Sequence, residues 1–337
     1  MHYITKIKNR AIKFKDYILR QARKNTTIVC MLEKRKLNRG YKIYKSVSIN
    51  NIEHTYIFPY NSLGDIYIIS LFFLAHNRKF INPFQLVVTG GGCLRVAKMM
   101  GIEKCVSINA RDMRHLSQFA IAFQRELPKL EILHFEYPHT SLSSGLSNLY
   151  RLNFVDCYEE FIFSQKISKM NLRFNLSSTL NEDEINELGI IKGMSIIISP
   201  YAKSIQQLPE YFWIELSNRL TKLGFSVYTN CNGNYELPIR GTKRISFTLE
   251  KAVSILDYAG FFIGLRSGFC DIISSSKCEK VIIYSRTQHQ YISNLEHYSL
   301  KKVPGARDFK EVIFSQSPDF ISYVLSLLKV DNMHLED

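Results

Sequence analysis

Short runs of apolar residues alternate with longer segments of helical period along the chain, from about residue 50 onward. The apolar runs predict strands at 54–60, 84–89, 105–108, 131–135, 195–199, 225–229, 261–264 and 280–284. The segments between them predict helices at 66–76, 93–100, 210–223, 249–259, 268–276 and 318–329. Strands separated by helical segments are typical of parallel βαβ units, so the pattern predicts the α/β class.

The alternation occurs twice, and a polar stretch at 177–187 separates the two copies. This organisation predicts two Rossmann-like domains facing a cleft. The expected division of the chain is a basic segment at 1–50, a first domain at 51–175, a linker at 176–192, a second domain at 193–315 and a closing helix and tail at 316–337.

The composition is that of a folded chain, with 46% apolar residues, 22% charged residues and ample aromatic core material. The seven cysteines are scattered and form no C-x-x-C pair, which excludes a zinc ribbon or a disulfide framework and favours a reducing compartment. No stretch has the roughly 20 apolar residues of a membrane span, and the N-terminus lacks the apolar core of a secretory signal. We therefore expect a protein of the cytosol or of a membrane surface.

Most of the net charge of +14 lies at the start of the chain. Residues 1–45 contain fourteen Lys or Arg and two acidic residues, so the rest of the chain is nearly neutral. Apolar residues recur there at helical spacing, at Ile4, Ile7, Ala11, Phe14 and Ile18. A basic amphipathic helix predicts binding to an anionic membrane surface, although a helix packed on its own domain with a solvated basic face gives the same pattern. Nucleic acid is not an expected partner, because no recognition motif for it occurs.

Two segments resemble nucleotide-binding or hydrolase motifs but lack the residue spacing that these motifs require. Gly90-Gly91-Gly92 ends a predicted strand, but Arg95 stands where a dinucleotide fingerprint needs its third glycine. The segment 264–268 reads G-x-x-S-G and places its serine one position too late for a nucleophile elbow. No phosphate-binding P-loop and no H-x-x-x-H pair of the zinc-binding kind occurs, so the motifs give no reason to expect a bound cofactor or a zinc site.

One candidate for chemistry is Leu63-Gly64-Asp65, directly after the first predicted strand. Ligands of open parallel sheets bind outside the carboxyl ends of the strands, so a carboxylate at this position could serve as a general base. An aspartate that caps the following helix is an equally good interpretation of the same residues.

A second candidate is Gly264-Leu265-Arg266-Ser267-Gly268, again between a predicted strand and a helix. An arginine fork, a serine hydroxyl and a glycine at a helix start favour a bound phosphate, although a serine-capped helix with a surface arginine has the same sequence. Asp271, one turn later, fits a sugar hydroxyl or the helix dipole better than a diphosphate. A third loop at 199–203 adds the cation of Lys203.

These loops resemble those of the GT-B glycosyltransferases, specifically the heptosyltransferase-like family that builds bacterial lipopolysaccharide. The resemblance extends from about 54 to 290. Residues 56–70 resemble the family's first strand with its L-G-D and the apolar helix that follows. Residues 200–203 and 206–213 are similar to its segment P-G-A-S … K-x-W-P-x-x-x-F. Residues 259–271 are similar to its segment a-x-x-h-h-G-x-D-[ST]-G-x-x-H. Four positions depart from the family: Gln206 replaces its Lys, Leu208 its Trp, Arg266 its Asp and Asp271 its His. These departures keep the phosphate loop but remove the carboxylate that reads the donor sugar, which argues against ADP-heptose as the donor.

The resemblance implies an inverting, metal-independent glycosyltransferase whose first domain binds the acceptor and whose second domain binds the donor. Its substrates would be a nucleotide-diphospho-sugar and a surface-polysaccharide or lipid-linked glycan. Asp65 would be the base, and the leaving diphosphate would meet Lys203, Arg266, Ser267 and Gly268. Candidate sugar or nucleotide contacts are Gly64, Ser199, Tyr201, Gln206 and Asp271.

We expect the enzyme at the inner face of the plasma membrane, bound through residues 1–45. Three alternatives stay open: a GT-B epimerase, a retaining transferase, and a non-catalytic nucleotide- or lipid-binding protein on the same scaffold.

Overall fold

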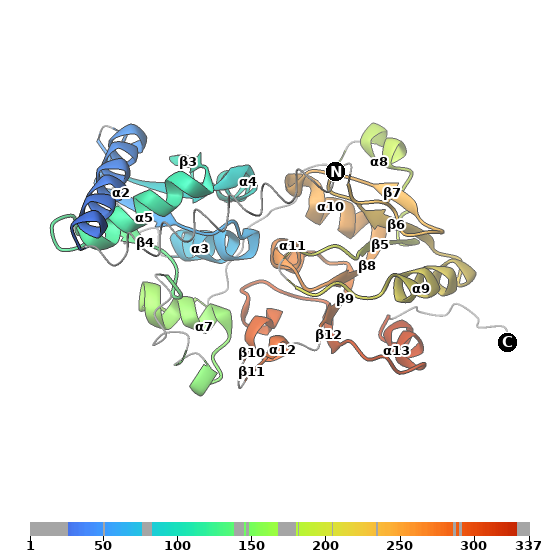
Figure 1. The fold of residues 1–337 in the computed structure, drawn as a ribbon. Coiled ribbons are helices and arrows are strands. Elements are labelled where there is room, and N and C mark those ends of the chain that lie inside the picture. Colours follow the sequence, from blue (N-terminus) through green and yellow to red (C-terminus); the bar gives the residue numbers. More distant parts are fainter. Residues whose placement is uncertain are drawn as a thin grey trace, which may run out of the picture. The chain divides into compact units, whose positions relative to one another are not determined.

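The fold is seen in a computed structural model (Figure 1). It describes residues 26–49, 51–75, 83–137, 145, 148–167, 180, 182–203, 205–233, 235–285, 288–289 and 292–328. The apolar stripe from Ile4 to Ile18 lies outside the described residues.

The first sheet has four strands in the order β3-β2-β1-β4, and β1 pairs in parallel with both β2 and β4. The strands are β1 (His54–Phe58), β2 (Phe84–Thr89), β3 (Cys105–Ile108) and β4 (Leu130–Ile132). The chain passes from β1 outward to β2 and β3 and then returns to place β4 on the other side of β1. The direction in which successive strands are added therefore reverses between β1 and β4. Open parallel sheets bind ligands at such a switch point, outside the carboxyl ends of the strands.

The second sheet has six strands in the order β12-β9-β8-β5-β6-β7, all parallel. The strands are β5 (Ser195–Ser199), β6 (Ser226–Asn230), β7 (Lys243–Ile245), β8 (Gly260–Leu265), β9 (Glu279–Tyr284) and β12 (Phe309–Ile313). Every residue of β5 is buried, as expected of a central strand covered on both faces. The winding of this sheet reverses between β5 and β8, which places the loops after Ser199 and Leu265 at its switch point.

The remaining elements connect or cover the sheets. A short antiparallel pair, β10 (Gln288–His289) and β11 (Ile292–Ser293), forms a third sheet. The helices are α2 (Thr26–Val47), α3 (Leu63–Ala75), α4 (Gly90–Met99), α5 (Ala110–Ala122), α7 (Phe154–Tyr158), α8 (Glu182–Leu188), α9 (Glu210–Lys222), α10 (Leu249–Ala259), α11 (Gly268–Ile272), α12 (Asn294–Tyr298) and α13 (Phe320–Ser326), with one π-helical turn at Glu159–Phe163 and 3₁₀ turns at Ile273–Ser275 and Leu300–Lys302.

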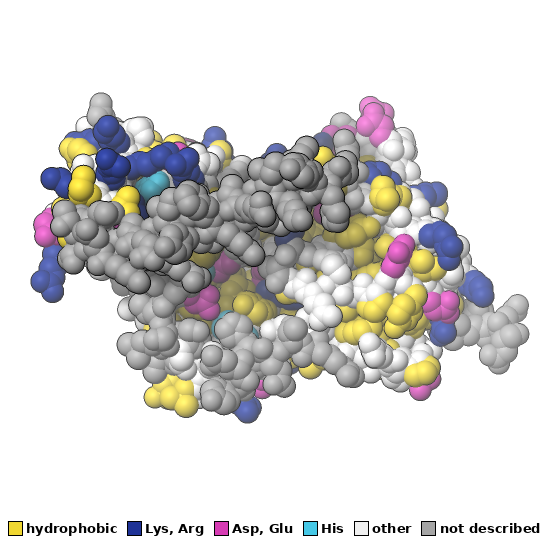
Figure 2. Space-filling model, in the orientation of Figure 1, with side chains coloured by type: hydrophobic (Ala, Val, Ile, Leu, Met, Phe, Trp, Pro, Cys, Tyr) yellow, Lys and Arg dark blue, Asp and Glu magenta, His cyan; other side chains and the backbone are white. Residues whose placement is uncertain are grey.

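Helix α2 packs closely on α5, and a glycine makes the approach possible. A Cβ added to Gly40 would lie 2.3 Å from the carbonyl oxygen of His115 and 2.5 Å from Cβ of Phe119. Arg39 forms an ion pair with Asp112 at 3.0 Å across the same contact. The opposite face of α2 is basic and exposed, and Figure 2 shows Lys and Arg side chains gathered where Figure 1 places α2 and α5. Residues 26–47 thus belong to a folded unit, as a packed helix with a solvated basic face.

The contacts divide the chain into two compact units. Unit 1 comprises residues 1–60, 82–90 and 106–132, and unit 2 comprises 61–81, 91–105 and 133–337. This grouping differs from the division expected at 176–192, because α3 and the segment from residue 133 cluster with the second sheet. Helix α3 does so through its contact with α11, which is described below.

The predicted α/β class with two parallel sheets is confirmed. Every strand that the apolar runs predicted is present, with ends shifted by a few residues. The elements that the patterns did not predict are α2, α5, α7, α12, β7, β10, β11 and β12.

Candidate functional site

Asp65 lies in the first turn of α3, the helix that follows β1. Both of its carboxylate oxygens accept hydrogen bonds: the Ser62 hydroxyl donates to Oδ2, and the Tyr158 hydroxyl donates to Oδ1 at 2.7 Å. The side chain is 21% exposed, so water or a substrate can reach it. Asp65 is the third residue of α3 rather than its N-cap, so the helix dipole favours its carboxylate, and its partial exposure is compatible with the role of a base.

His134 approaches the same carboxylate from the segment that follows β4. Because β1 and β4 are parallel neighbours, their carboxyl ends lie at one edge of the sheet, and the segments leaving them carry Asp65 and His134. The Nδ1 atom of His134 accepts the backbone N–H of Glu136 at 3.0 Å, so the ring proton of the neutral imidazole is on Nε2. This Nε2 lies 3.9 Å from Oδ1 of Asp65. The ring stacks on Phe135, with centroids 4.9 Å apart.

Tyr158 is the last residue of α7 and is fully buried. Burial and the neighbouring charge of Asp65 raise the pKa of its hydroxyl well above the usual value, so the hydroxyl keeps its proton and acts as a donor. The chain changes from α-helical to π-helical directly after it, at Glu159–Phe163. Single π turns of this kind occur often at functional sites.

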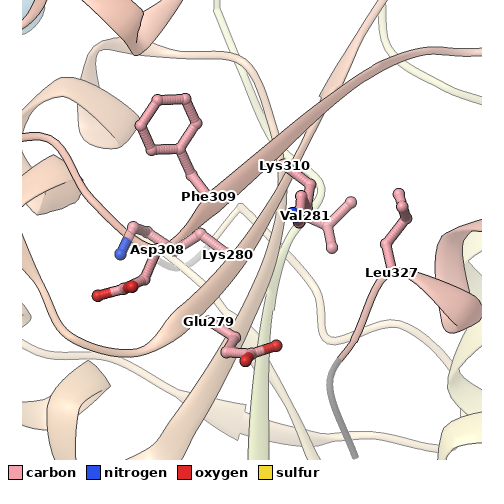
Figure 3. A pocket seen from close by; sticks show the side chains of 7 residues that line it. All are labelled: Glu279, Lys280, Val281, Asp308, Phe309, Lys310 and Leu327. Atoms are coloured by element: carbon pink, nitrogen blue, oxygen red, sulfur yellow. The ribbon is translucent and has the colours of Figure 1, made fainter.

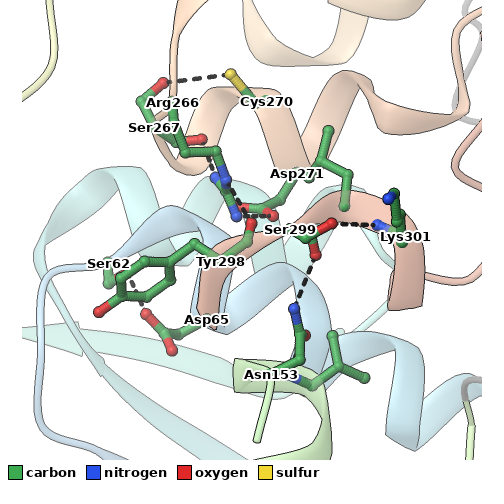
Figure 4. Close-up of polar contacts among 12 residues, drawn as sticks. Ser62, Asp65, Asn153, Arg266, Ser267, Cys270, Asp271, Tyr298, Ser299 and Lys301 are labelled. Atoms are coloured by element: carbon green, nitrogen blue, oxygen red, sulfur yellow. Dashed lines mark hydrogen bonds and ion pairs between the residues drawn. The ribbon is translucent and has the colours of Figure 1, made fainter. Parts of the chain in front are cut away.

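Arg266 differs from the sequence expectation of a guanidinium open to a phosphate. It is 7% exposed, and its two terminal nitrogens form a bidentate pair with Asp271 at 2.9 and 2.7 Å (Figure 4). Nε donates to the carbonyl of Tyr298 at 2.9 Å, and Nη1 also donates to the carbonyl of Ser267. The guanidinium carbon lies 5.6 Å from the ring centroid of Phe154. The Arg266 guanidinium, which the sequence suggested would bind a diphosphate, thus binds the carboxylate of Asp271, which lies one turn further along the chain.

Asp271 is buried beside the start of α3. Burial raises the pKa of its carboxyl to about 6, and the Arg266 guanidinium acts in the opposite direction. A Cβ added to Gly64 would lie 2.2 Å from Oδ2 of Asp271, and one added to Gly268 would lie 2.6 Å from the backbone nitrogen of Gly64. The two glycines therefore allow the first turns of α3 and α11 to touch. Gly268 faces Gly64 here, whereas the sequence suggested that it faces a ligand.

The other predicted contacts lie along the carboxyl edge of the second sheet. Ser199 is buried and pairs with Gly264 across β5 and β8. Tyr201 is half-buried, and its hydroxyl donates to the carbonyl of Leu237. Lys203 and Gln206 are exposed in the segment that follows β5.

A separate cavity lies at the amino ends of β9 and β12, lined by Lys280, Asp308 and Lys310 among others (Figure 3). Lys280 is buried there and donates to the carbonyls of Ser276 and Cys278 at 2.6 and 2.9 Å, which fixes the turn before β9. Ligands of parallel sheets bind at the opposite edge, so this cavity is not the candidate site.

Within the part of the chain that the structure describes, no three His, Cys, Asp or Glu side chains lie close enough together to hold a metal ion. Metal independence stays a prediction. In the same described ranges, no helix combines the length and the apolar character needed to cross a bilayer.

The sequence pattern did not indicate His134 and Tyr158, which come to Asp65 from distant parts of the chain. One local signal marked the element of Tyr158: Asn153 and Asp156 form a capping box at the start of α7. The sequence holds no comparable signal for His134, because its role depends on the reversal between β1 and β4.

The sequence matches no known family profile and no curated protein. Its fold matches that of a crystal structure of the glycosyl transferase family 9 from Veillonella parvula, with a TM-score of 0.50 and 12% identity over 85% of this chain and 93% of that one. The chain has a GT-B fold. The two parallel sheets described above are the two Rossmann-like halves of this GT-B fold.

Two further GT-B matches have lower scores. The heptosyltransferase WaaC of E. coli with ADP gives a TM-score of 0.49 and 13% identity, over 81% of this chain and 99% of that one. The iron-containing dodecameric glycosyltransferase TibC of enterotoxigenic E. coli gives 0.47 and 16%, over 80% and 64% of the two chains.

Proposed function

We propose that this protein is a glycosyltransferase that moves a sugar from a nucleotide-diphospho-sugar to a surface-polysaccharide or lipid-linked glycan acceptor. The observation that carries the proposal is Asp65, a partly exposed carboxylate with both oxygens held by hydroxyl donors at the start of α3. The GT-B fold and the resemblance of the three sequence segments support the same conclusion.

Asp65 acts in this proposal as the general base. The acceptor hydroxyl loses its proton to the carboxylate while its oxygen attacks the anomeric carbon. The bond from that carbon to the diphosphate breaks, and the diphosphate leaves with the electron pair. Attack opposite to the leaving group inverts the anomeric configuration.

The leaving diphosphate is proposed to bind at the switch point between β5 and β8. Lys203 supplies a cation from the loop after β5, and Ser267 supplies a hydroxyl from the loop after β8. Arg266 fixes the shape of the second loop through Asp271, and α11 has only five residues and therefore a weak dipole. Charge neutralisation by side chains in place of a metal ion is the basis for expecting metal-independent transfer.

The acceptor of such an enzyme is held at a membrane, and we propose that residues 1–45 bring the protein to an anionic inner leaflet. The exposed cations of α2 support this, because each Lys or Arg near an anionic surface contributes about 1 kcal/mol. The structure supplies these cations from a helix that is packed on α5.

A thermal-shift screen against ADP-, GDP-, UDP- and CDP-sugars tests the proposal first. We expect stabilisation by one nucleotide class, followed by release of that nucleoside diphosphate when a glycolipid acceptor is added, with and without EDTA. The anomeric configuration of the product distinguishes inversion from retention. No shift with any nucleotide would favour a binding protein on the same scaffold, and conversion of the donor sugar without an acceptor would indicate an epimerase.

A further inference from the structure

Two side chains far from Asp65 in sequence converge on the same atom of its carboxylate. The Tyr158 hydroxyl lies 2.7 Å from Oδ1, and Nε2 of His134 lies 3.9 Å from it. Both side chains are buried, whereas Asp65 is partly exposed. The two side chains therefore approach the carboxylate from the protein interior and leave it accessible to a substrate.

The helix that carries Tyr158 is fixed by contacts at its first turn. Asn153, at the N-cap of α7, donates to the carbonyls of Ser299 and Glu296 at 3.0 and 3.2 Å. Asp156 forms an ion pair with Lys302 at 2.7 Å. These contacts hold α7 against the segment around α12, so the Tyr158 hydroxyl has a defined position.

A second contact joins the π-helical turn to the helix that bears Asp65. Phe163 stacks on Phe72 of α3, with ring centroids 4.2 Å apart. The segments of Asp65 and Tyr158 are therefore held together by an aromatic contact as well as by the hydrogen bond. An aromatic contact of this kind would survive removal of the tyrosine hydroxyl, which makes a conservative substitution informative.

The proton positions fit a donating role. The raised pKa of Tyr158 keeps its hydroxyl protonated, and the contact of His134 Nδ1 with the Glu136 N–H leaves the imidazole proton on Nε2, toward Asp65. A separation of 3.9 Å is longer than a hydrogen bond, but such contacts in enzymes without substrate often shorten when the substrate binds.

We propose that Tyr158 and His134 are positioning residues that hold the Asp65 carboxylate in one orientation for proton transfer. This inference rests on the proposed role of Asp65 as the base. Neither residue takes the proton: it passes from the acceptor hydroxyl to Asp65 alone, while the two side chains stabilise the carboxylate before the transfer.

Other titratable groups lie around the same cluster and set the background for its pH dependence. Hydrogen bonds to a carboxylate favour its charged form, whereas nearby negative charges disfavour it. The surrounding groups are Cys93 on α4, Glu136 after β4, Arg266 and Asp271 around α11, and Tyr298 on α12.

Tyr158→Phe is the first test. We expect kcat to fall roughly 10- to 100-fold, as for loss of a hydrogen bond to a charged group, with the donor KM changed less than twofold. The acid limb of the kcat/KM profile should move to higher pH by about one unit, because the carboxylate loses a donor that favours its charged form. Tyr228→Phe is the matched control, since Tyr228 is equally buried and its hydroxyl donates to the carbonyl of Gly189 in another part of the second unit. It should leave the pH profile unchanged.

His134 is tested by a pair of amides. His134→Asn keeps an acceptor near the Nδ1 position for the Glu136 N–H but lacks the donor at Nε2, whereas His134→Gln places an amide donor near Nε2. We expect the Asn variant to lose activity and to shift the acid limb upward, and the Gln variant to recover at least half of the loss.

A nitrogen-detected NMR spectrum of the full chain, with the His134 signal assigned through His134→Gln, tests the geometry without any activity. We expect the Nε2–H tautomer, and the Nδ1–H tautomer would overturn the assignment of His134. If Tyr158→Phe lowers the melting temperature but leaves the pH profile and kcat unchanged, its hydrogen bond is only a structural link and the inference is wrong. If the wild-type protein transfers sugar from no donor, the proposed function itself fails.

Discussion

Replacing Arg266 should reduce folding stability far more than nucleotide affinity. Its guanidinium holds Asp271 through two hydrogen bonds of 2.9 and 2.7 Å, and the two side chains are 8% and 2% exposed. Arg266→Met removes the charge but keeps an apolar side chain of similar length. It leaves the Asp271 carboxylate buried without its cation, which costs about 3–5 kcal/mol in comparable cases.

The free energy of unfolding can be followed through the fluorescence of Trp213, the single tryptophan, which is buried in the core of the second sheet. The double variant Arg266→Met, Asp271→Leu should recover about 2 kcal/mol or more of the loss, because no unpaired charge is left in the interior. Arg219→Met is the control: its pair with Glu215 is exposed, so its loss should change stability by at most about 0.5 kcal/mol.

The opposite pattern would refute this reasoning. If Arg266→Met unfolds within about 0.5 kcal/mol of the wild type but binds nucleoside diphosphate ten times more weakly, Arg266 is a ligand of the diphosphate. The pair seen in the structure would then be a resting arrangement that the substrate breaks.

Three further predictions concern the contact of Gly64, the cation of Lys203 and the N-terminal segment. Gly64→Ala should destabilise the protein by roughly 1–3 kcal/mol in urea unfolding, since its Cβ would lie 2.2 Å from the Asp271 carboxylate, whereas Gly91→Ala meets nothing within 4 Å and should be neutral or stabilising. Lys203→Ala should weaken nucleoside diphosphate binding about tenfold by calorimetry, and Lys222→Ala, an exposed control on α9, should not. A chain lacking residues 1–24 loses eight of the fourteen cations of residues 1–45, so it should stay folded and sediment less with anionic liposomes at low salt than the full-length protein. Precipitation of the truncated chain would place this segment in the core, and a full-length protein that does not bind such liposomes would refute the anchor.

The sequence predicted the sheets well because buried strands are continuous apolar runs. The run Ser195–Ser199 is one, and the structure buries every residue of it. Helix α5 was missed although Asn109 and Asp112 mark its start, where the Asn109 side chain accepts the Asp112 N–H. Helix α2 was not predicted because its many basic residues obscure the apolar pattern of its buried face. That face is recognised only from the structure, where Gly40 contacts α5.

The candidate site was predicted in part. The sequence predicted the place of Asp65 at the carboxyl end of a strand, because Asp65 follows directly after the apolar run of that strand. The pairing of Arg266 with Asp271 was not, because the same two residues could face a ligand or each other and only burial decides between these. His134 and Tyr158 needed the three-dimensional arrangement, as nothing local connects residues so far apart in sequence.

Asp65→Asn separates a general base from a structural carboxylate, because the amide keeps the size of the side chain and removes its ability to take a proton. We expect transfer from the donor identified by thermal shift to fall by about 100-fold or more, while the melting temperature and donor affinity stay close to those of the wild type. Transfer within tenfold of the wild-type rate would contradict the assignment of Asp65 as the base. A large loss of melting temperature with residual activity would instead make Asp65 a structural residue of α3.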